Sequence, residues 1–253
     1  MRTPMRSSRC TAADRHAART IAGAALFAVL AAATATAAER PRTAADPLEK
    51  LNRATYAFND ALDRMLARPL AKAYRKVVPE PARNAVSNVV ANLEYPTTAV
   101  NDALQGKFRD AGSDVLRFLV NSTLGIAGLA DPATRLGLRA NDEDFGQTLG
   151  RWGVPSGPYL MLPLLGPSTL RDGPARVPDG YTNARHYIGN GSTEWYLLGV
   201  DVLDARASLL AAQGALERAY DPYALMRDAY LQRREYLVRD GDVGGRVADR
   251  AAH

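Results

Sequence analysis

Residues 141–172 read NDEDFGQTLGRWGVPSGPYLMLPLLGPSTLRD: three consecutive acids, then a series of glycines, then prolines that interrupt an apolar run. The apolar run at 158–167 is too hydrophobic for an ordinary surface loop. It is also too rich in proline for the interior of a helix or a central strand, because proline lacks an amide hydrogen. The stretch therefore predicts irregular apolar backbone held by surrounding helices. Such backbone either lines a cavity or meets lipid, or it is a buried core loop, and both interpretations remain open from these residues alone.

A first amphipathic helix is predicted from Asp46 and Pro47, because aspartate caps helices and proline suits their first turn. Apolar residues then recur at steps of three and four, which places them on one helix face. They are Leu48, Leu51, Thr55, Phe58, Leu62 and Met65. The opposite face is predicted to be solvated, and Pro69 is predicted to end or kink the helix.

Helical periodicity continues along the chain. Two short helices are predicted within 86–104, the first stopped at Tyr95-Pro96, and an amphipathic helix follows over 108–119. Glycines and prolines in 173–191 predict a second irregular region. A regular helical pattern then spans 195–216, and a last helix begins at Asp221-Pro222. With no useful alternating strand pattern, the sequence predicts an all-α protein of short, proline-broken amphipathic helices around the irregular Gly/Pro-rich apolar segment.

Most of the net positive charge lies at the N-terminus. The chain has 32 basic and 27 acidic residues, and residues 1–38 contain five arginines and one aspartate, which leaves 27 basic and 26 acidic residues. The remainder is nearly neutral, so the high pI gives no support for nucleic-acid binding, which requires a basic face on the domain. An arginine-bearing start, an apolar core at 21–33 and small residues up to Ala37 are typical of a cleavable signal peptide over residues 1–38, which predicts export.

The single cysteine, Cys10, precedes the apolar core. No lipobox cysteine follows that core, so no lipidation is predicted, and the exported part has neither a disulfide nor a thiol nucleophile. Residues 39–45 are predicted to form a linker and 46–240 a single folded domain. Residues 241–253 are polar and glycine-containing, which predicts a disordered tail.

The residues give little support for catalysis. A serine–histidine–acid triad would have to use His186 with Ser156 or Ser168, and neither serine lies in a Gly-x-Ser-x-Gly elbow. No dinucleotide fingerprint or phosphate-binding glycine loop is present. We therefore predict no enzyme and no cofactor, and a periplasmic lipid hydrolase is the alternative that these residues leave.

Charged residues near the apolar run have two interpretations each. The acids at 142–144 either bind a divalent cation or place negative charge at a helix start; the second is favoured because the spacing of an EF-hand is absent, and no metal is predicted. Arg151 and Arg171 either contact lipid phosphates or pair with Asp144 or Asp172.

Several blocks of this sequence, in one order from about Asp46 to about Asp240, resemble the MlaA/VacJ family, the outer-membrane phospholipid-transport proteins of Gram-negative bacteria. The blocks are DPLEKLNRATYAFNDALDR, VPEPARNAVSNVVANLEYPTTAVNDALQGK, RFLVNSTLGIAGLADPA, FGQTLGRWGVPSGPYLMLPLLGPSTLRD and DPYALMRDAYLQRREYLV. A match of this length and order is far more specific than a short motif.

The resemblance implies a helical, ring-like domain in the inner leaflet of the outer membrane. Its expected function is to give mislocalised outer-leaflet phospholipid a channel to the periplasm without covalent chemistry, which maintains lipid asymmetry. The expected partners are phospholipids, trimeric porins and a periplasmic phospholipid carrier. A porin-associated scaffold that does not conduct lipid is a further alternative. The family is typically lipidated, so the missing lipobox cysteine is a departure from its pattern.

The resemblance also implies residues at the lipid channel or membrane surface. The Phe58-Asn59 pair falls where the family's Asn-Phe segment helps to hold the ring. The residues predicted to face lipid or adjoin the channel are Phe58, Asn59, Phe145, Tyr159, Leu160, Leu162, Leu164 and Leu165, with Arg151 and Arg171 as candidate headgroup contacts. Simple core packing is the alternative for the apolar residues at 145–165.

Overall fold

The computed structural model describes residues 46–188 and 191–241. Within these residues the regular structure is almost entirely helical, and one two-stranded sheet is the exception. The predicted all-α class is therefore confirmed in its main feature. The predicted signal peptide (1–38) and linker (39–45), and all but the first residue of the predicted tail (241–253), lie outside the described residues.

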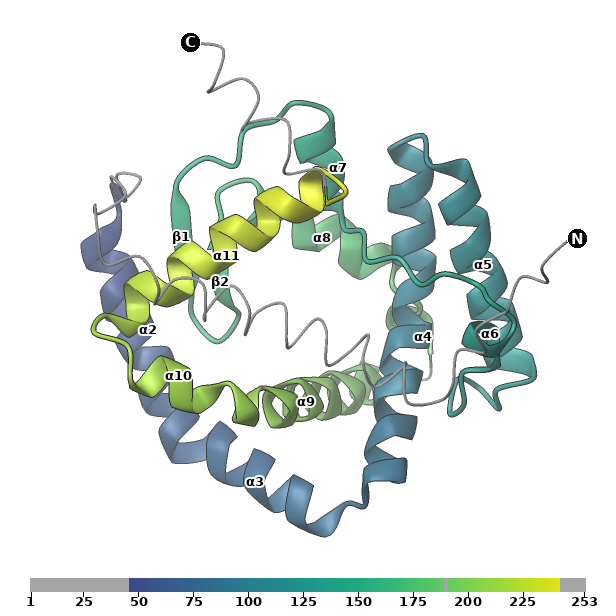
Figure 1. Cartoon of the computed structure of the whole chain (residues 1–253), viewed down its shortest axis with the longest axis horizontal. Helices are drawn as coiled ribbons and strands as arrows, with labels where there is room; N and C mark the ends of the chain where they lie inside the picture. The colour runs from purple at the N-terminus through teal and green to yellow at the C-terminus, as the bar shows by residue number, and fades with distance from the viewer. Residues whose placement is uncertain (1–45, 189–190, 242–253) are drawn as a thin grey trace, which may run out of the picture.

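Pro69 kinks the first helix without ending it. Helix α2 (Glu49–Leu62) passes into a π-helical turn, η1 (Asp63–Ala67), and then into α3 (Arg68–Val77). Proline has no amide hydrogen for the carbonyl four residues earlier, and just before it the Arg68 amide bonds to the Asp63 carbonyl at π-helical spacing. Because of this wider turn, α2 and α3 run in different directions (Figure 1).

Helix α4 (Glu80–Leu104) is continuous, which corrects the prediction of two short helices separated at Tyr95-Pro96. Pro96 removes one helical hydrogen bond, but much of the helix from Asn92 to Asp102 is buried. This face packs along α5 (Phe108–Thr123). Helix packing supplies most of a helix's stability in proteins, and here it outweighs the single proline.

The apolar run at 158–167 contains a β-hairpin, so the prediction of wholly irregular backbone is wrong there. Helix α7 (Phe145–Arg151) precedes strands β1 (Tyr159–Leu162) and β2 (Gly166–Thr169), which pair antiparallel with Met161 opposite Pro167. In a two-stranded sheet each strand has one free edge, and proline is tolerated in edge strands.

The region 173–191 is also more regular than predicted. Helix α8 (Asp172–Thr182) contains Pro178, and a 3₁₀ turn, η2 (Ala184–Tyr187), follows it. The remaining chain forms α9 (Gly191–Ser208), η3 (Leu209–Ala211), α10 (Gln213–Glu217) and α11 (Pro222–Val238). The single helix predicted over 195–216 is therefore interrupted by a 3₁₀ turn. The predicted start of the last helix is confirmed, because the Asp221 side chain accepts the Ala224 amide at 3.1 Å.

The elements follow a ring. In Figure 1, α2, α3 and α4 form three sides of a circuit, and α7, α8 and the hairpin close it. Helix α9 packs on α3 and α4, and α11 returns to α7 and β2. Helix α5 and the short α6 (Pro132–Arg135) lie on the far side of α4 from this circuit (Figure 1).

Polar side chains dominate the buried residues. Among the described residues, fifteen polar or charged residues are buried but only eleven hydrophobic ones, six of which are alanine. Many large apolar side chains are exposed instead, on nearly every helix. Soluble monomers rarely expose large apolar patches, whereas proteins that meet lipid or a partner do.

Candidate functional site

Two asparagines of α2 hold the hairpin. Asn52 accepts the Met161 amide at 2.8 Å and donates to the Tyr159 carbonyl at 2.9 Å. About two helical turns later, Asn59 accepts a hydrogen bond from the Leu164 amide and donates one to the Leu162 carbonyl, both at 2.9 Å. Each side-chain amide thus makes the hydrogen bonds that a neighbouring strand would make along the free edge of β1. Together the two asparagines attach the hairpin to α2.

Buried ion pairs close the ring on its other side. Arg234 of α11 binds Asp144 at 2.5 Å (Nη1–Oδ2) and Asp172 at 3.0 Å (Nε–Oδ2). Arg171 binds Asp172 at 2.8 Å. Burial acts to raise the pKa of Asp144 and Asp172, but the hydrogen bonds and charge of these arginines outweigh it, so both pKa values lie below the usual range. Gly146 leaves room for this cluster, because a Cβ there would lie 2.6 Å from Asp172 Oδ1.

A pair of buried carboxyl groups lies between α4 and α5. Burial is the main cause that raises the pKa of both Asp102 and Asp114, that of Asp102 to about 8. Both oxygens of Asp102 are buried without a donor among the described residues. Asp114 accepts the side-chain amide of Asn141 at 2.8 Å. The neighbouring Asp114 carboxyl group also acts to raise the pKa of Asp102, so this arrangement favours a proton on the pair.

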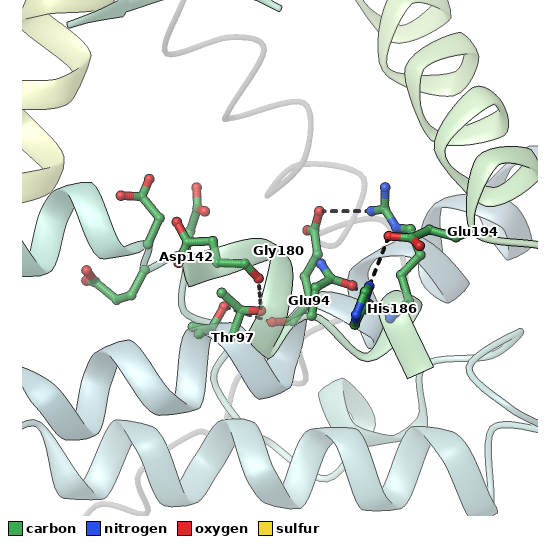
Figure 2. Close-up of a pocket in the computed structure, with 12 residues that line it drawn as sticks. Glu94, Thr97, Asp142, Gly180, His186 and Glu194 are labelled. Carbon is green, nitrogen blue, oxygen red and sulfur yellow. Dashed lines mark hydrogen bonds and ion pairs between the residues drawn. The ribbon is translucent and has the colours of Figure 1, made fainter. Parts of the chain in front are cut away.

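A polar cavity of about 290 Å³ opens among α4, α8, η2, α9 and the residues before α7 (Figure 2). Half of the twelve lining residues are acidic, and the full lining is Glu94, Thr97, Thr98, Asp142, Glu143, Asp144, Asp179, Gly180, Asn183, Arg185, His186 and Glu194. Asp179 accepts the Phe145 amide at 3.0 Å and the Asn101 side chain at 3.0 Å, and burial is the first cause that raises the pKa of Asp179 to about 6.

The two basic residues in the cavity lining are Arg185 and His186. Arg185 binds Asp201 at 3.1 Å, and Nδ1 of His186 lies 3.5 Å from Glu194 (Figure 2). The hydroxyl of Ser168, in contrast, is buried and donates to the carbonyl of the next residue. None of the recorded contacts in residues 46–188 and 191–241 joins His186 to either candidate serine.

The acidic run and the two arginines have the following partners. Asp144 caps α7 by accepting the Gln147 amide at 2.8 Å, which confirms its predicted place at a helix start. Groups of acids and histidines arranged for a metal ion were not found among the described residues. The pairing of Arg171 with Asp172 is confirmed. Arg151 pairs with Asp240 at 2.6 Å instead of the two partners predicted for it.

The predicted lipid-facing residues divide into two groups. Phe58 (55% exposed), Leu164 (72%) and Leu165 (63%) present their side chains at the surface. Leu164 lies at the hairpin turn with a φ of +65°. Such a conformation is unusual for leucine, and it holds the side chain outward at the tip.

The second group lies deeper. Tyr159 is buried against Tyr223 and Tyr230, so for this residue the core-packing alternative describes its position. Leu160 and Leu162 are half-buried. Phe145 is half-buried at the start of α7, where its ring meets that of Trp152 edge-on at 6.2 Å.

Sequence reasoning missed Asn52 and Arg234. Asn52 and Asn59 are seven residues apart, so their shared helix face was available as a signal. Arg234 has no comparable local signal, because its partners are 62 and 90 residues away.

A helical ring with a polar interior and an apolar exterior defines a protein that works among apolar surroundings. The chain belongs to the MlaA lipoprotein family, whose model matches residues 44–237. It is 39% identical over 207 residues to the "Intermembrane phospholipid transport system lipoprotein MlaA" of Escherichia coli strain K12, covering 78% of this chain and 80% of that one.

Further relatives agree with this assignment. The Haemophilus influenzae protein of the same name is 34% identical over 201 residues, covering 78% of this chain and 80% of its own. A solved structure described as "Structural basis for maintenance of bacterial outer membrane lipid asymmetry" superposes with a TM-score of 0.70 at 38% identity, covering 77% of this chain and 99% of that one. Within the described residues, every helix is too short or too polar to cross a bilayer.

Proposed function

We propose that this chain is the outer-membrane component of an intermembrane phospholipid transport system. It gives mislocalised outer-leaflet phospholipid a route to the periplasm and so maintains lipid asymmetry. Family membership supports this role, since relatives carry that system's name. The observation that carries it is the distribution of polarity: buried polar residues inside a ring, with apolar side chains outside.

This distribution suits a lipid that moves without reacting. A phospholipid needs apolar contact for its acyl chains and polar contact for its headgroup. The exposed Phe58, Leu164 and Leu165 supply apolar contact in this proposal, and the mixed-charge cavity beside Arg185 supplies polar groups. Among residues 46–188 and 191–241, no recorded contact joins His186 to Ser156 or Ser168, so we propose binding and passage in place of hydrolysis.

The proposal extends to the rest of the protein. Residues 1–38 direct export, and 46–240 form the working domain on the periplasmic face of the outer membrane. Trimeric porins and a periplasmic phospholipid carrier are the proposed protein partners. Arg151 is a candidate headgroup contact, because it is exposed even though it pairs with Asp240.

The test uses a Gram-negative strain that lacks its own family member. We expect this chain to lower the phospholipid exposed in the outer leaflet, and to co-purify with phospholipid after extraction from membranes. Leu164→Asp should impair both, because it places a charge on the proposed lipid surface. Aspartate tolerates a positive φ better than leucine does, so this change does not strain the turn.

The matched control is Leu164→Met, which keeps the apolar contact and should restore activity. A wild-type protein that carries no lipid and leaves outer-leaflet phospholipid unchanged would refute transport. If the wild type restores asymmetry and Leu164→Asp does so equally well, the hairpin tip does not contact the moving lipid, and a scaffold role is favoured for this part of the ring.

A further inference from the structure

Helix α3 and its flanking residues have three distinct faces. The inner stripe, Ala67, Ala71, Tyr74 and Val78, is turned towards the ring; Ala71 is fully buried and packs where α3 meets α9. The apolar stripe consists of Leu66, Leu70, Ala73 and Val77, and all four are exposed. The basic stripe consists of Lys72, Arg75 and Lys76, also exposed. Spacings of three and four residues keep each stripe on one side of the helix.

Among the described residues, the apolar stripe is covered only in part. Leu70 is 50% exposed and Val77 76% exposed. Tyr74, one position away on the inner stripe, instead donates its hydroxyl to Asp204 of α9 at 3.2 Å. The helix is therefore anchored to the ring through one face, and its apolar stripe remains available for contact with another molecule.

The basic stripe carries charge that the fold leaves largely uncompensated. Arg68, on the same helix, is neutralised by Glu217 at 2.8 Å and Asp63 at 3.4 Å. In the part of the chain that the structure describes, Lys72, Arg75 and Lys76 take part in no recorded ion pair. Lys72 acts on Glu217 only weakly: hydrogen bonds from Gln213 and the neighbouring Arg68 lower the pKa of Glu217 more than Lys72 does.

The arginines of α2 and η1 are paired, whereas Lys50 of α2 takes part in no recorded ion pair among the described residues. Arg53 binds Asp221 at 2.6 Å, and Arg64 binds Asp60 one turn away. Arg83 is used within the fold, because it donates to the Val78 carbonyl at 2.7 Å and so covers the end of α3. From Glu49 to Val77, three of the four cations without a recorded ion pair thus lie beside the apolar stripe of α3, and the fourth is Lys50.

We propose that the outer face of α3 binds a bilayer surface rich in anionic phospholipid, with the apolar stripe in the acyl boundary and the basic stripe on lipid phosphates. An amphipathic helix with lysine and arginine beside apolar residues lies in the interface in this way. A bilayer is the proposed binding partner because its acyl region and its layer of phosphates lie next to each other, as the apolar and basic stripes of α3 do. The inference rests on the proposed membrane function but adds a preference for lipid charge.

This attachment has a physical use. One acyl chain gives only marginal membrane binding, and a basic patch is one of the second signals that make attachment stable. In residues 11–253 there is no cysteine, so contacts of the domain itself contribute directly to how it is held. A charge-selective face on α3 would also fix which edge of the ring lies at the headgroups.

The test measures partitioning of the full-length protein onto vesicles by flotation. Vesicles of pure phosphatidylcholine are compared with vesicles of phosphatidylcholine and phosphatidylglycerol at 7:3. Each cation near an anionic surface contributes about 1 kcal/mol, or roughly fivefold. The triple variant Lys72→Gln, Arg75→Gln, Lys76→Gln should therefore lose on the order of 100-fold in its partition onto the anionic vesicles and little onto the neutral ones.

The matched control removes three exposed arginines from the α5 and α6 region: Arg109→Gln, Arg135→Gln, Arg139→Gln. Its net charge change is the same, and the N-terminal region is common to all proteins compared. We expect this control to keep most of the preference for anionic vesicles. We expect 0.5 M salt to abolish that preference in the wild type, because salt screens the attraction between the basic stripe and the lipid phosphates. Circular dichroism confirms that both triple variants remain folded.

Three results overturn the inference: no anionic preference in the wild type, equal loss in both triple variants, or a triple α3 variant that binds like the wild type. Membrane binding that depends on α3 only when a protein partner is reconstituted would make α3 a protein-docking face, which also overturns it. Phospholipid co-purification is measured in parallel. If lipid still co-purifies while the anionic preference is absent, this inference fails and the transport function does not.

Discussion

Replacing Asn52 with alanine tests the attachment of the hairpin to the ring. Asn52 is 1% exposed and bonds to the Tyr159 carbonyl and the Met161 amide. The variant leaves one buried donor and one buried acceptor of β1 without partners. Each such group costs about 1–3 kcal/mol, so the expected loss of unfolding free energy is about 4 kcal/mol. For a domain of this size, that corresponds to a fall in Tm of roughly 8–16 °C.

Asn59→Ala is the matched comparison. Asn59 makes the same two kinds of bond, with the Leu162 carbonyl and the Leu164 amide, but it is only half-buried. Water reaches the freed groups more easily there, so we expect about half the loss in stability.

Amide hydrogen exchange gives the specific readout. In Asn52→Ala, protection of the Met161 amide should fall most, because its only recorded acceptor is the Asn52 side chain. In Asn59→Ala, the Leu164 amide should respond instead. Uniform loss of protection across the chain, or an undiminished Met161 amide in Asn52→Ala, would refute the argument that these side chains act as a surrogate strand.

Three further predictions concern the ring closure and the buried acids. Arg234→Met removes the arginine partner of Asp144 and one of the two arginines on Asp172, which keeps Arg171, and should lower stability by about 3 kcal/mol, the low end of the cost of breaking a buried ion pair; Arg233→Met, which removes only an exposed pair, should change Tm little. Gly150→Ala places a Cβ 2.7 Å from the Arg171 side chain and should lower Tm in a thermal melt. Gly112 also lies in a helix, but a Cβ there has no neighbour within 4 Å outside the nearby helix backbone, so Gly112→Ala should be neutral or stabilising. The pKa of Asp102 is raised to about 8 in the fold, so its contribution to stability is present in acid and is lost as pH rises from about 4 to about 8; Asp102→Asn should flatten the fall of Tm between pH 5 and pH 8, and an unchanged slope would contradict this.

Local sequence signals predicted elements well where they act through a few neighbouring residues. The cap at Asp221, the kink at Pro69 and the helix start at Asp144 all follow from the chemistry of one or two side chains. The helix through Pro96 and the hairpin around Pro167 did not follow, because proline preferences are weak compared with tertiary contacts. Burial of α4 against α5 decides the first, and the edge-strand position decides the second.

The site was predictable in part. The resemblance directed attention to Asn59, whose bonds to the hairpin are now visible, but it gave no reason to select Asn52 or Arg234. Partners far apart in sequence become neighbours only when the ring closes. For Arg151, a carboxylate partner was expected nearby in the chain, and the observed one is Asp240.

Amphipathic periodicity fixed which residues share a helix face but left open which face is buried. The apolar stripe of α2 was expected to oppose a solvated face, yet Leu51 and Phe58 are exposed while Asn52 is buried. The next strongest case is α5, where the stripe at 108–119 lies largely outside and Asp114 and Arg117 lie inside. Helical spacing groups the apolar residues on one face, but it does not say whether that face is buried or exposed. The surroundings of the helix decide this. In water the apolar face would turn inward; a polar interior becomes favourable only where the exterior is apolar. The inverted helices α2 and α5 are therefore a physical reason, independent of any relative, to expect apolar surroundings for this ring.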